Sequence, residues 1–267
     1  MYGNDSRNDR GEEQMKLTDF IAAMDNLAPR ELALGFDNVG LLIGTERRDI
    51  KKVLVALDCT TDVADEAISK GCDMVLTHHP LMFHAIKHIM PDEPATAPIY
   101  RLIRNDIAMF AAHTNLDAAD AGVNYELSKL LGLSNPVPAG EERIMRVGDL
   151  ENPMMLDDFI RFAQTKLHTN INVTGKNRLI RRVAVMGGSG GRDFPIAHAA
   201  GADLYLTGEC PHDAAVESGV LGLSIAVAGH FETETIVLKP LIEYLQNHTE
   251  GVQYILAEAN IPVFREV

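Results

Sequence analysis

Three short apolar segments of the chain end in histidine, and two of these histidines stand four residues before a carboxylate. The residues concerned are His78, His79, His113, Asp117, His230 and Glu234. Neutral imidazole and carboxylate are ligands that suit Zn, Mn or Fe, and the lack of clustered thiolates argues against a closed structural zinc site. Two carboxylates can also bridge two ions about 3.5–4 Å apart. The pattern predicts a metal site that could hold two ions, in which His113 is either a ligand or a donor that orients Asp117.

His78 and His79 are adjacent, and adjacent side chains on a strand point to opposite faces of a sheet. Both can serve one site only if the chain turns here, and Pro80 favours a turn because it breaks the strand. Alternatively, each histidine is a ligand of a different ion. A single histidine at a strand end is more often a hydrogen-bonding residue than a ligand. Three such segments, two of them with a carboxylate at the same spacing, favour a metal site.

The segments that precede the histidines are typical of an α/β fold. The apolar run 53–57 is typical of a buried parallel strand. A helix over about Val63–Ser69 and a second strand over Met74–Leu76 follow it. Open α/β sheets place their ligand sites at the carboxyl ends of their strands, which is where His78 and His79 stand.

The same pattern returns 130 residues later without a gap. Segment 51–55 matches 181–185, and segment 71–77 matches 201–207. Chance similarity is the alternative, since such patterns are common in α/β proteins. The constant offset and the repeated spacing from histidine to carboxylate favour an internal duplication. We therefore expect two similar α/β lobes that face each other across a cleft, where ligand sites usually form.

Two further features lie near the second set of strand ends. The glycine-rich segment 187–191 could hold phosphate with its backbone amides, or it could be a tight turn that another part of the chain approaches closely. The duplication places Glu209 where the first unit has His79. Glu209 and the nearby His212 are therefore candidate catalytic residues for substrate binding or proton transfer, with a structural hydrogen bond or a helix cap as the alternative.

Composition excludes several classes of protein. The 267 residues are 46% hydrophobic and 23% charged, with a formal net charge of −14. This charge repels phosphate backbones and anionic lipid, and no apolar run reaches the roughly 18 residues that a membrane helix needs. Residues 1–14 lack the apolar core of a secretory signal, so a disordered leader and a natural start at Met15 are expected. Three cysteines without metal-type spacing suggest reduced thiols in a cytoplasmic protein.

Three segments together resemble a known family. They are 77–81, with two adjacent histidines, 113–117, which runs from histidine to aspartate, and 229–234, with the pattern His-Phe-x-Thr-Glu. In these segments the chain resembles the NIF-three-like dinuclear metal-binding proteins, often labelled GTP cyclohydrolase 1 type 2 homologues. The likeness extends to 36–40, to the glycine-rich segment and to 207–209, so it covers nearly all of the chain after Met15.

The resemblance implies two interlinked α/β lobes with a dinuclear metal site in the cleft between them, and assembly into a toroidal homohexamer. The expected division is a leader over 1–14, a discontinuous first lobe over 15–125 and 228–267, and a second lobe over 126–227. The family's metal ligands fall on His78, His79, Asp117, His230 and Glu234, with His113 close by. The chain departs from the family in two places: Phe36 stands where Trp is frequent, and Glu232 where a small residue is usual.

Three functions compete. The first is a metal-dependent hydrolase with a small-molecule substrate, and the family label suggests a GTP-like nucleotide or a phosphoester. Here Glu209, His212 or His113 would handle protons. The second is a metal-binding ring that acts as an interaction or regulatory scaffold without turnover, and the third is metal storage or delivery. Membrane and nucleic-acid partners are not expected, and the metal is left open among Fe, Mn and Zn.

Overall fold

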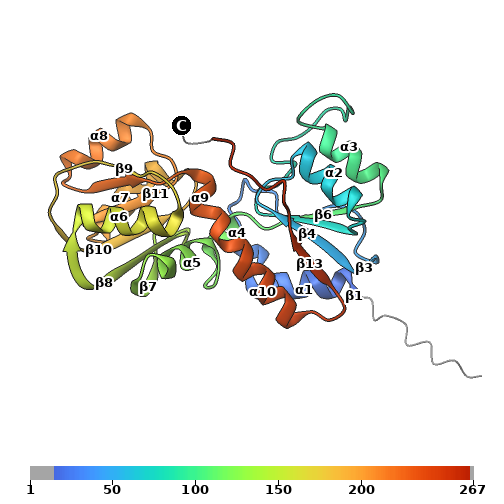
Figure 1. Ribbon diagram of the computed structural model, residues 1–267, viewed down its shortest axis with the longest axis horizontal. Coiled ribbons are helices and arrows are strands. Elements are labelled where there is room, and N and C mark those ends of the chain that lie inside the picture. Colours follow the sequence, from blue (N-terminus) through green and yellow to red (C-terminus); the bar gives the residue numbers. More distant parts are fainter. Residues whose placement is uncertain (1–14, 265–267) are drawn as a thin grey trace, which may run out of the picture.

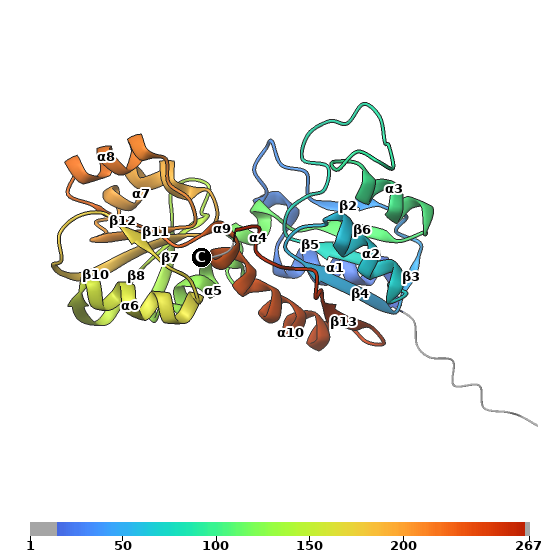
Figure 2. The same ribbon diagram turned by 45° about the horizontal axis from the view of Figure 1, so that its top comes forward.

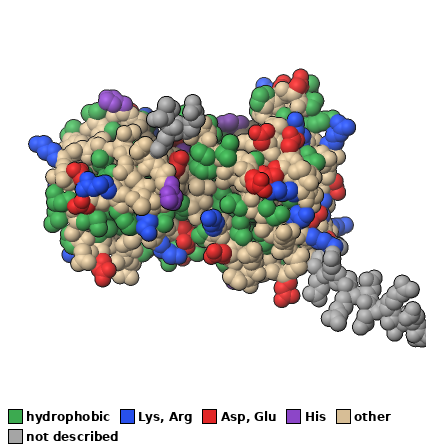
Figure 3. Space-filling view, viewed as in Figure 1, with side chains coloured by type: hydrophobic (Ala, Val, Ile, Leu, Met, Phe, Trp, Pro, Cys, Tyr) green, Lys and Arg blue, Asp and Glu red, His purple; other side chains and the backbone are tan. Residues whose placement is uncertain are grey.

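Two β-sheets lie side by side in the computed structural model, and each is covered by helices on both faces (Figure 1, Figure 2). The structure describes residues 15–264, so the leader expected over 1–14 lies outside the described residues. Within that range, none of the helices has the length and apolar character needed to cross a membrane. On the face shown in Figure 3, acidic and basic side chains are interspersed over both halves of the molecule.

The first sheet has five strands in the order β13-β4-β5-β6-β2. These strands are β13 (Gln253–Leu256), β4 (Lys52–Ala56), β5 (Met74–Thr77), β6 (Ala108–Ala111) and β2 (Gly40–Ile43). All neighbouring pairs are parallel except β2 with β6. Alternate residues of β4 face opposite cores, as the two-residue period of a strand requires. Val53 and Val55 contribute to the core beneath α1 (Leu17–Leu27) and α10 (Leu238–His248). Leu54 and Ala56 contribute to the core beneath α2 (Thr61–Ser69) and α3 (Ala97–Arg104).

The second sheet has six strands in the order β7-β8-β10-β11-β12-β9. These strands are β7 (Leu133–Ala139), β8 (Met145–Met155), β10 (Leu179–Met186), β11 (Leu204–Thr207), β12 (Ser224–Val227) and β9 (Asn172–Val173). Only β10, β11 and β12 are parallel to one another. One face packs against α5 (Val123–Leu130) and α6 (Leu156–Leu167), and the other against α7 (Phe194–Ala199) and α8 (His212–Val220). The strands β1 (Met15–Lys16) and β3 (Asp49–Ile50) form a separate antiparallel pair.

The two sheets repeat the same contacts 130 residues apart. Oδ2 of Asp73 accepts the backbone N–H groups of Lys51 and Lys52 at 2.8 and 2.9 Å. Oδ2 of Asp203 accepts those of Arg181 and Arg182 at the same two distances. Both aspartates stand just before a central strand of their sheet, β5 or β11. The structure confirms two related α/β lobes.

The chain crosses between the sheets, which accounts for their interlinking. After β12 of the second sheet it forms the short helix α9 (His230–Glu234), then α10, and finally β13, which pairs with β4 of the first sheet. The division into lobes at residues 125 and 228 stays a prediction. A second short helix, α4 (Thr114–Ala118), follows β6, and both short helices lie between the two halves (Figure 1). The remaining 3-10 turns are η1 (Arg30–Leu32), η2 (Gly190–Asp193) and η3 (Thr235–Val237).

Candidate metal centre

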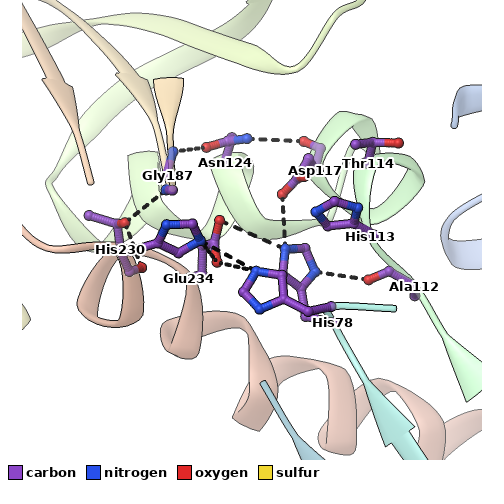
Figure 4. A network of polar contacts seen from close by, with 12 residues as sticks. His78, Ala112, His113, Thr114, Asp117, Asn124, Gly187, His230 and Glu234 are labelled. Atoms are coloured by element: carbon purple, nitrogen blue, oxygen red, sulfur yellow. Dashed lines mark hydrogen bonds and ion pairs between the residues drawn. The ribbon is translucent and has the colours of Figure 1, made fainter. Parts of the chain in front are cut away.

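Four histidine rings meet at the boundary between the two sheets, and Figure 4 labels three of them, His78, His113 and His230. His78 and His79 follow β5, His113 follows β6, and His230 follows β12. The ring centre of His79 lies 5.0 Å from that of His78, 5.5 Å from His113 and 5.3 Å from His230. The strand β5 ends at Thr77, so the adjacent pair is not held to opposite faces of the sheet. The turn expected at His78 and His79 is therefore present, and both rings reach one cluster.

Each of these rings has an oxygen acceptor at its Nδ1 atom. The partners are the carbonyl of Ala112 for His78 at 2.8 Å, Asp58 for His79 at 2.8 Å, Asp37 for His113 at 2.9 Å and Glu209 for His230 at 2.9 Å. A carbonyl or carboxylate can only accept, so Nδ1 must carry the hydrogen. In the neutral ring this leaves the lone pair on Nε2. Such outer contacts fix the tautomer and orientation of histidines that bind metals.

The buried carboxylate of Glu234 and the partly exposed one of Asp117 face these Nε2 atoms. Oε2 of Glu234 lies 3.0 Å from Nε2 of His79 and 3.0 Å from Nε2 of His230. Oε2 of Glu234 and Nε2 of His78 are both buried without a hydrogen-bond partner among the described residues. Oδ1 of Asp117 lies 3.6 Å from Nε2 of His78. Buried polar atoms are almost always paired, so two atoms without partners in one cluster fit bound cations.

Electrostatics at the centre also favours a cation. Burial raises the pKa of Asp117 well above its ordinary value, and the negative charge of Glu234 raises it further. Burial lowers the pKa of His78 to about 3, so this ring is neutral at pH 7. Burial would raise the pKa of Glu234 as well, but contacts with His230 and His79 outweigh burial and lower it. A positive ion between these carboxylates would remove the repulsion that disfavours Asp117 as an anion.

The donor atoms fall into two overlapping groups that could each hold an ion. One consists of His78, His79 and His113, and the other of His79, His230 and Glu234, with the ligand atoms of each group within 4.8 Å of one another. Asp117 lies beside His78, at the first group. All six residues predicted from the sequence are therefore brought together, although their assignment as ligands stays a prediction.

The glycine-rich segment packs directly against the centre. A Cβ atom on Gly188 would lie 2.1 Å from Oε1 of Glu234, and Gly188 has φ +61°. A Cβ atom on Gly187 would lie 3.2 Å from the backbone of Thr233. The backbone N–H of Gly187 donates to Asn124 at 2.7 Å. Of the two interpretations open from the sequence, these contacts favour the close approach of another part of the chain.

A cavity of about 560 Å³ opens beside the centre, within the usual size of a small-molecule pocket. Its wall includes His79, His230 and Glu209, together with Asn170 from the second half and Phe264 near the C-terminus. Glu209 also accepts a hydrogen bond from Ser189 at 2.8 Å. Burial would raise the pKa of Glu209, but the contacts with Ser189 and His230 lower it.

The two candidate catalytic residues occupy different places. Glu209 lies on the cavity wall and binds His230, whereas His212 begins α8 and does not line this cavity. Their catalytic roles stay predictions. Of the two departures from the family, Glu232 lines the cavity, and Phe36 is 66% exposed with its ring centre 6.1 Å from that of Phe83.

Sequence reasoning missed the carboxylates that orient the rings. Asp58 follows directly after the apolar run 53–57, so the strand-end position that identified the histidines could have identified Asp58 as well. Asp37 belongs to the segment 36–40. No local sequence pattern indicates that this segment contacts His113. The side chain of Asp37 is fully buried. Burial opposes ionisation of Asp37, but hydrogen bonds from His113 and Thr114 outweigh burial and lower its pKa.

Comparison with known proteins identifies the family of this chain. The sequence profile of Duf34/NIF3 (NGG1p interacting factor 3) matches residues 15–262. The chain is 36% identical over 254 residues to the "GTP cyclohydrolase 1 type 2 homolog" of Clostridium perfringens, covering 91% of this chain and 97% of that protein.

Solved structures share the fold. Reduced HcgD from Methanocaldococcus jannaschii superposes with a TM-score of 0.82 at 30% identity, covering 92% of this chain and 99% of that one. A hypothetical protein of Staphylococcus aureus superposes with a TM-score of 0.85 at 27% identity, covering 96% and 100%. The resemblance found in the sequence is confirmed, and the chain belongs to the Duf34/NIF3 family.

Proposed function

We propose that the protein is a metal-dependent hydrolase that uses two divalent ions per subunit and acts on a nucleotide or another phosphoester. One observation carries the proposal: the Nδ1 atoms of four histidines are occupied by acceptors, so their Nε2 lone pairs are left for a cation beside two carboxylates. The names of relatives, such as "GTP cyclohydrolase 1 type 2 homolog", support the choice of a nucleotide.

The residues divide into two sets of ligands. His78, Asp117 and His113 would hold one ion, and His79, His230 and Glu234 the other. Imidazole and carboxylate donors without thiolate suit Zn, Mn or Fe. When bound, such a pair of ions lowers the pKa of water and polarises the group that is cleaved.

The chain's own residues bind and orient the substrate. The cavity beside His79 and His230 is large enough for a molecule of nucleotide size. Glu209 faces this cavity while it holds His230 through Nδ1, and its lowered pKa keeps it ionised at neutral pH. An ionised Glu209 can accept a proton from a group in the cavity, which is the role of a general base.

The test combines metal analysis with turnover. The purified protein, loaded with Mn²⁺, Fe²⁺ or Zn²⁺, is assayed against panels of nucleotides and phosphoesters. We expect two ions per chain, and at least about 100-fold less turnover in His78→Ala and Glu234→Gln, because each change removes a ligand or a charge from the centre. His248→Ala is the matched control, since His248 hydrogen-bonds the carbonyl of Tyr244 in its own helix.

Two results would contradict the proposal in different ways. Failure to bind a transition metal under any loading condition would remove the metal centre altogether. Two bound ions without turnover of any substrate would leave the scaffold function and reject the hydrolase. The same proposal includes assembly into a homohexamer, taken from the family resemblance, and a cytoplasmic location, taken from the three free cysteines. Sedimentation of the metal-loaded protein at the mass of six chains would support the assembly, and a stable monomer would reject it.

A further inference from the structure

The helix that carries Asp117 is too short to be stable without contacts from the rest of the chain. The five residues of α4 form little more than one turn, and isolated helices shorter than about 12 residues are marginal in water. Its position depends on contacts at its ends. At the start, Asp37 accepts a hydrogen bond from the backbone N–H of Thr114 at 3.0 Å. The direction of the Asp117 side chain therefore also depends on the contacts at the C-terminal end of α4.

Side chains bind the three consecutive carbonyls at the end of α4. Nδ2 of Asn124 donates to the carbonyl of Asp117 at 3.4 Å. Nη2 of Arg146 donates to the carbonyls of Ala118 and Ala119 at 2.7 and 2.8 Å. These are groups that the last turn of a helix leaves without partners. Arg146 thus binds both residues that directly follow Asp117.

Arg146 is an unusual residue to find in this place. It is 1% exposed and is among the largest fully buried side chains of the described chain. It also donates to the carbonyl of Arg143. The carboxylate near it, Oδ1 of Asp120 at 3.7 Å, belongs to a side chain that is 90% exposed. Burying a guanidinium is costly, so its contacts with the carbonyls are the interactions that compensate for that cost.

The contact joins the two halves of the molecule. Arg146 lies on β8 of the six-stranded sheet, whereas α4 follows β6 of the five-stranded sheet. Asn124, on α5, links the same helix end to Gly187 of the glycine-rich segment (Figure 4). Two side chains beyond the first sheet thus fix the end of the segment that carries Asp117.

We propose that Arg146 is a positioning residue of the metal centre: by binding the carbonyls of Ala118 and Ala119 it holds Asp117 against His78, so that the ion on this side binds only when the two halves are docked. This inference rests on the proposed metal centre. It assigns Arg146 no contact with the ion or the substrate.

The experiment compares Arg146→Lys and Arg146→Met with Arg182→Lys and Arg182→Met, using Mn²⁺ alone as the probe. Arg182 is a matched control because it lies on the same sheet and donates to a backbone carbonyl, that of Ala200 at 2.8 Å, far in sequence from any ligand. Folding is checked by circular dichroism and thermal melting. The readouts are the number of ions bound, their affinities, and whether the electron paramagnetic resonance spectrum is that of a coupled Mn²⁺ pair or of an isolated ion.

We expect the ion at Asp117 to bind about 10- to 100-fold more weakly in both Arg146 variants, as for other residues that orient ligands, with the other ion changed less than about threefold. The spectrum then becomes that of an isolated ion at Mn²⁺ concentrations that saturate the natural protein. Arg146→Lys retains one donor group, so it is expected to lose less affinity for this ion than Arg146→Met. The Arg182 variants keep two ions and the coupled spectrum.

Three outcomes would overturn the inference. A folded Arg146→Lys or Arg146→Met protein with two ions at natural affinity would show that Asp117 needs no such support. Failure of both Arg146 variants to fold would make Arg146 a structural residue of the sheet. A natural protein that binds no ion would remove the proposed function together with this inference, whereas the first two outcomes leave the proposed function intact.

Discussion

The Nε2 atoms of His79 and His230 lie 3.4 Å apart, and Oε2 of Glu234 lies 3.0 Å from each of them. The two histidines come from different sheets, at the ends of β5 and β12. Burial opposes protonation of His79, but contacts with Asp58 and Glu234 outweigh it and raise the pKa of His79 to about 10. The contact with Glu234 raises the pKa of His230 to about 9 despite burial. Without metal, protons take the place that a cation would occupy.

Metal binding should therefore release protons. At pH 7.5 both rings are charged in the metal-free protein, and a charged ring has no lone pair for a metal. Metal affinity should rise with pH up to about pH 10, the higher of the two values, and less steeply above about pH 9, where the His230 ring is already neutral. The slope should be about tenfold per pH unit for each displaced proton. Calorimetric titration with Mn²⁺ in two buffers with different heats of ionisation counts the protons. Equal heats in both buffers would contradict the prediction, and His248→Ala should behave as the natural protein.

Gly188 should not tolerate a side chain. In Gly188→Ala, the added Cβ would lie 2.1 Å from Oε1 of Glu234 and 3.3 Å from Nε2 of His230. Because Glu234 is buried, its displacement should lower the metal content, measured by elemental analysis of protein loaded with Mn²⁺. Gly201→Ala is the control: Gly201 has a similar φ of +74°, but its Cβ would meet nothing within 4 Å. Both variants should lose about 1–2 kcal/mol of stability from backbone strain, while only Gly188→Ala loses metal. Equal metal content in the two variants would show that the metal centre does not need a residue without a side chain at position 188.

The central strands of each lobe and the position of the histidines could be predicted because they depend on local patterns. Apolar runs of four or five residues predict buried strands, and the 130-residue offset predicts that Asp73 and Asp203 have equivalent places. The structure adds that both aspartates bind two backbone N–H groups at the start of the neighbouring strand. This contact is a physical reason for the repeated aspartate.

What could not be predicted depends on contacts between distant segments. The antiparallel strands β7, β8 and β9 extend only the second sheet, and the repeat contains no signal for them. Arg146 stands in the apolar pattern of β8 as a charged residue, which local reasoning would place at the surface. Its burial follows from the carbonyls of α4, which lie 27 and 28 residues away in the chain. Composition does not reveal such a partner.

Asp58 should control the affinity of the centre without binding the ion. Its Oδ1 atom accepts the Nδ1–H of His79 at 2.8 Å, which leaves the Nε2 lone pair of the neutral ring for metal. In Asp58→Ala, His79 is free to rotate or to adopt the other tautomer, and the contact that raises its pKa is lost. The first effect weakens metal binding and the second strengthens it at neutral pH. Removal of such an orienting partner typically costs about 10- to 100-fold in affinity.

The two effects separate with pH. Above about pH 10 the His79 ring is already neutral in the natural protein, so only the loss of orientation remains and the full decrease in affinity should appear. At pH 7 the His79 ring of Asp58→Ala loses its proton more easily than that of the natural protein, which offsets part of the loss of metal affinity. Asp58→Ala should therefore show a smaller decrease in affinity at pH 7, and its affinity should depend less steeply on pH. Asp65→Ala is the control, since Asp65 is 53% exposed compared with 49% for Asp58 and pairs with Arg101 away from the centre. Competition titrations with a chelator at the two pH values measure the affinities. A decrease that does not depend on pH would mean that Asp58 orients His79 without affecting its charge.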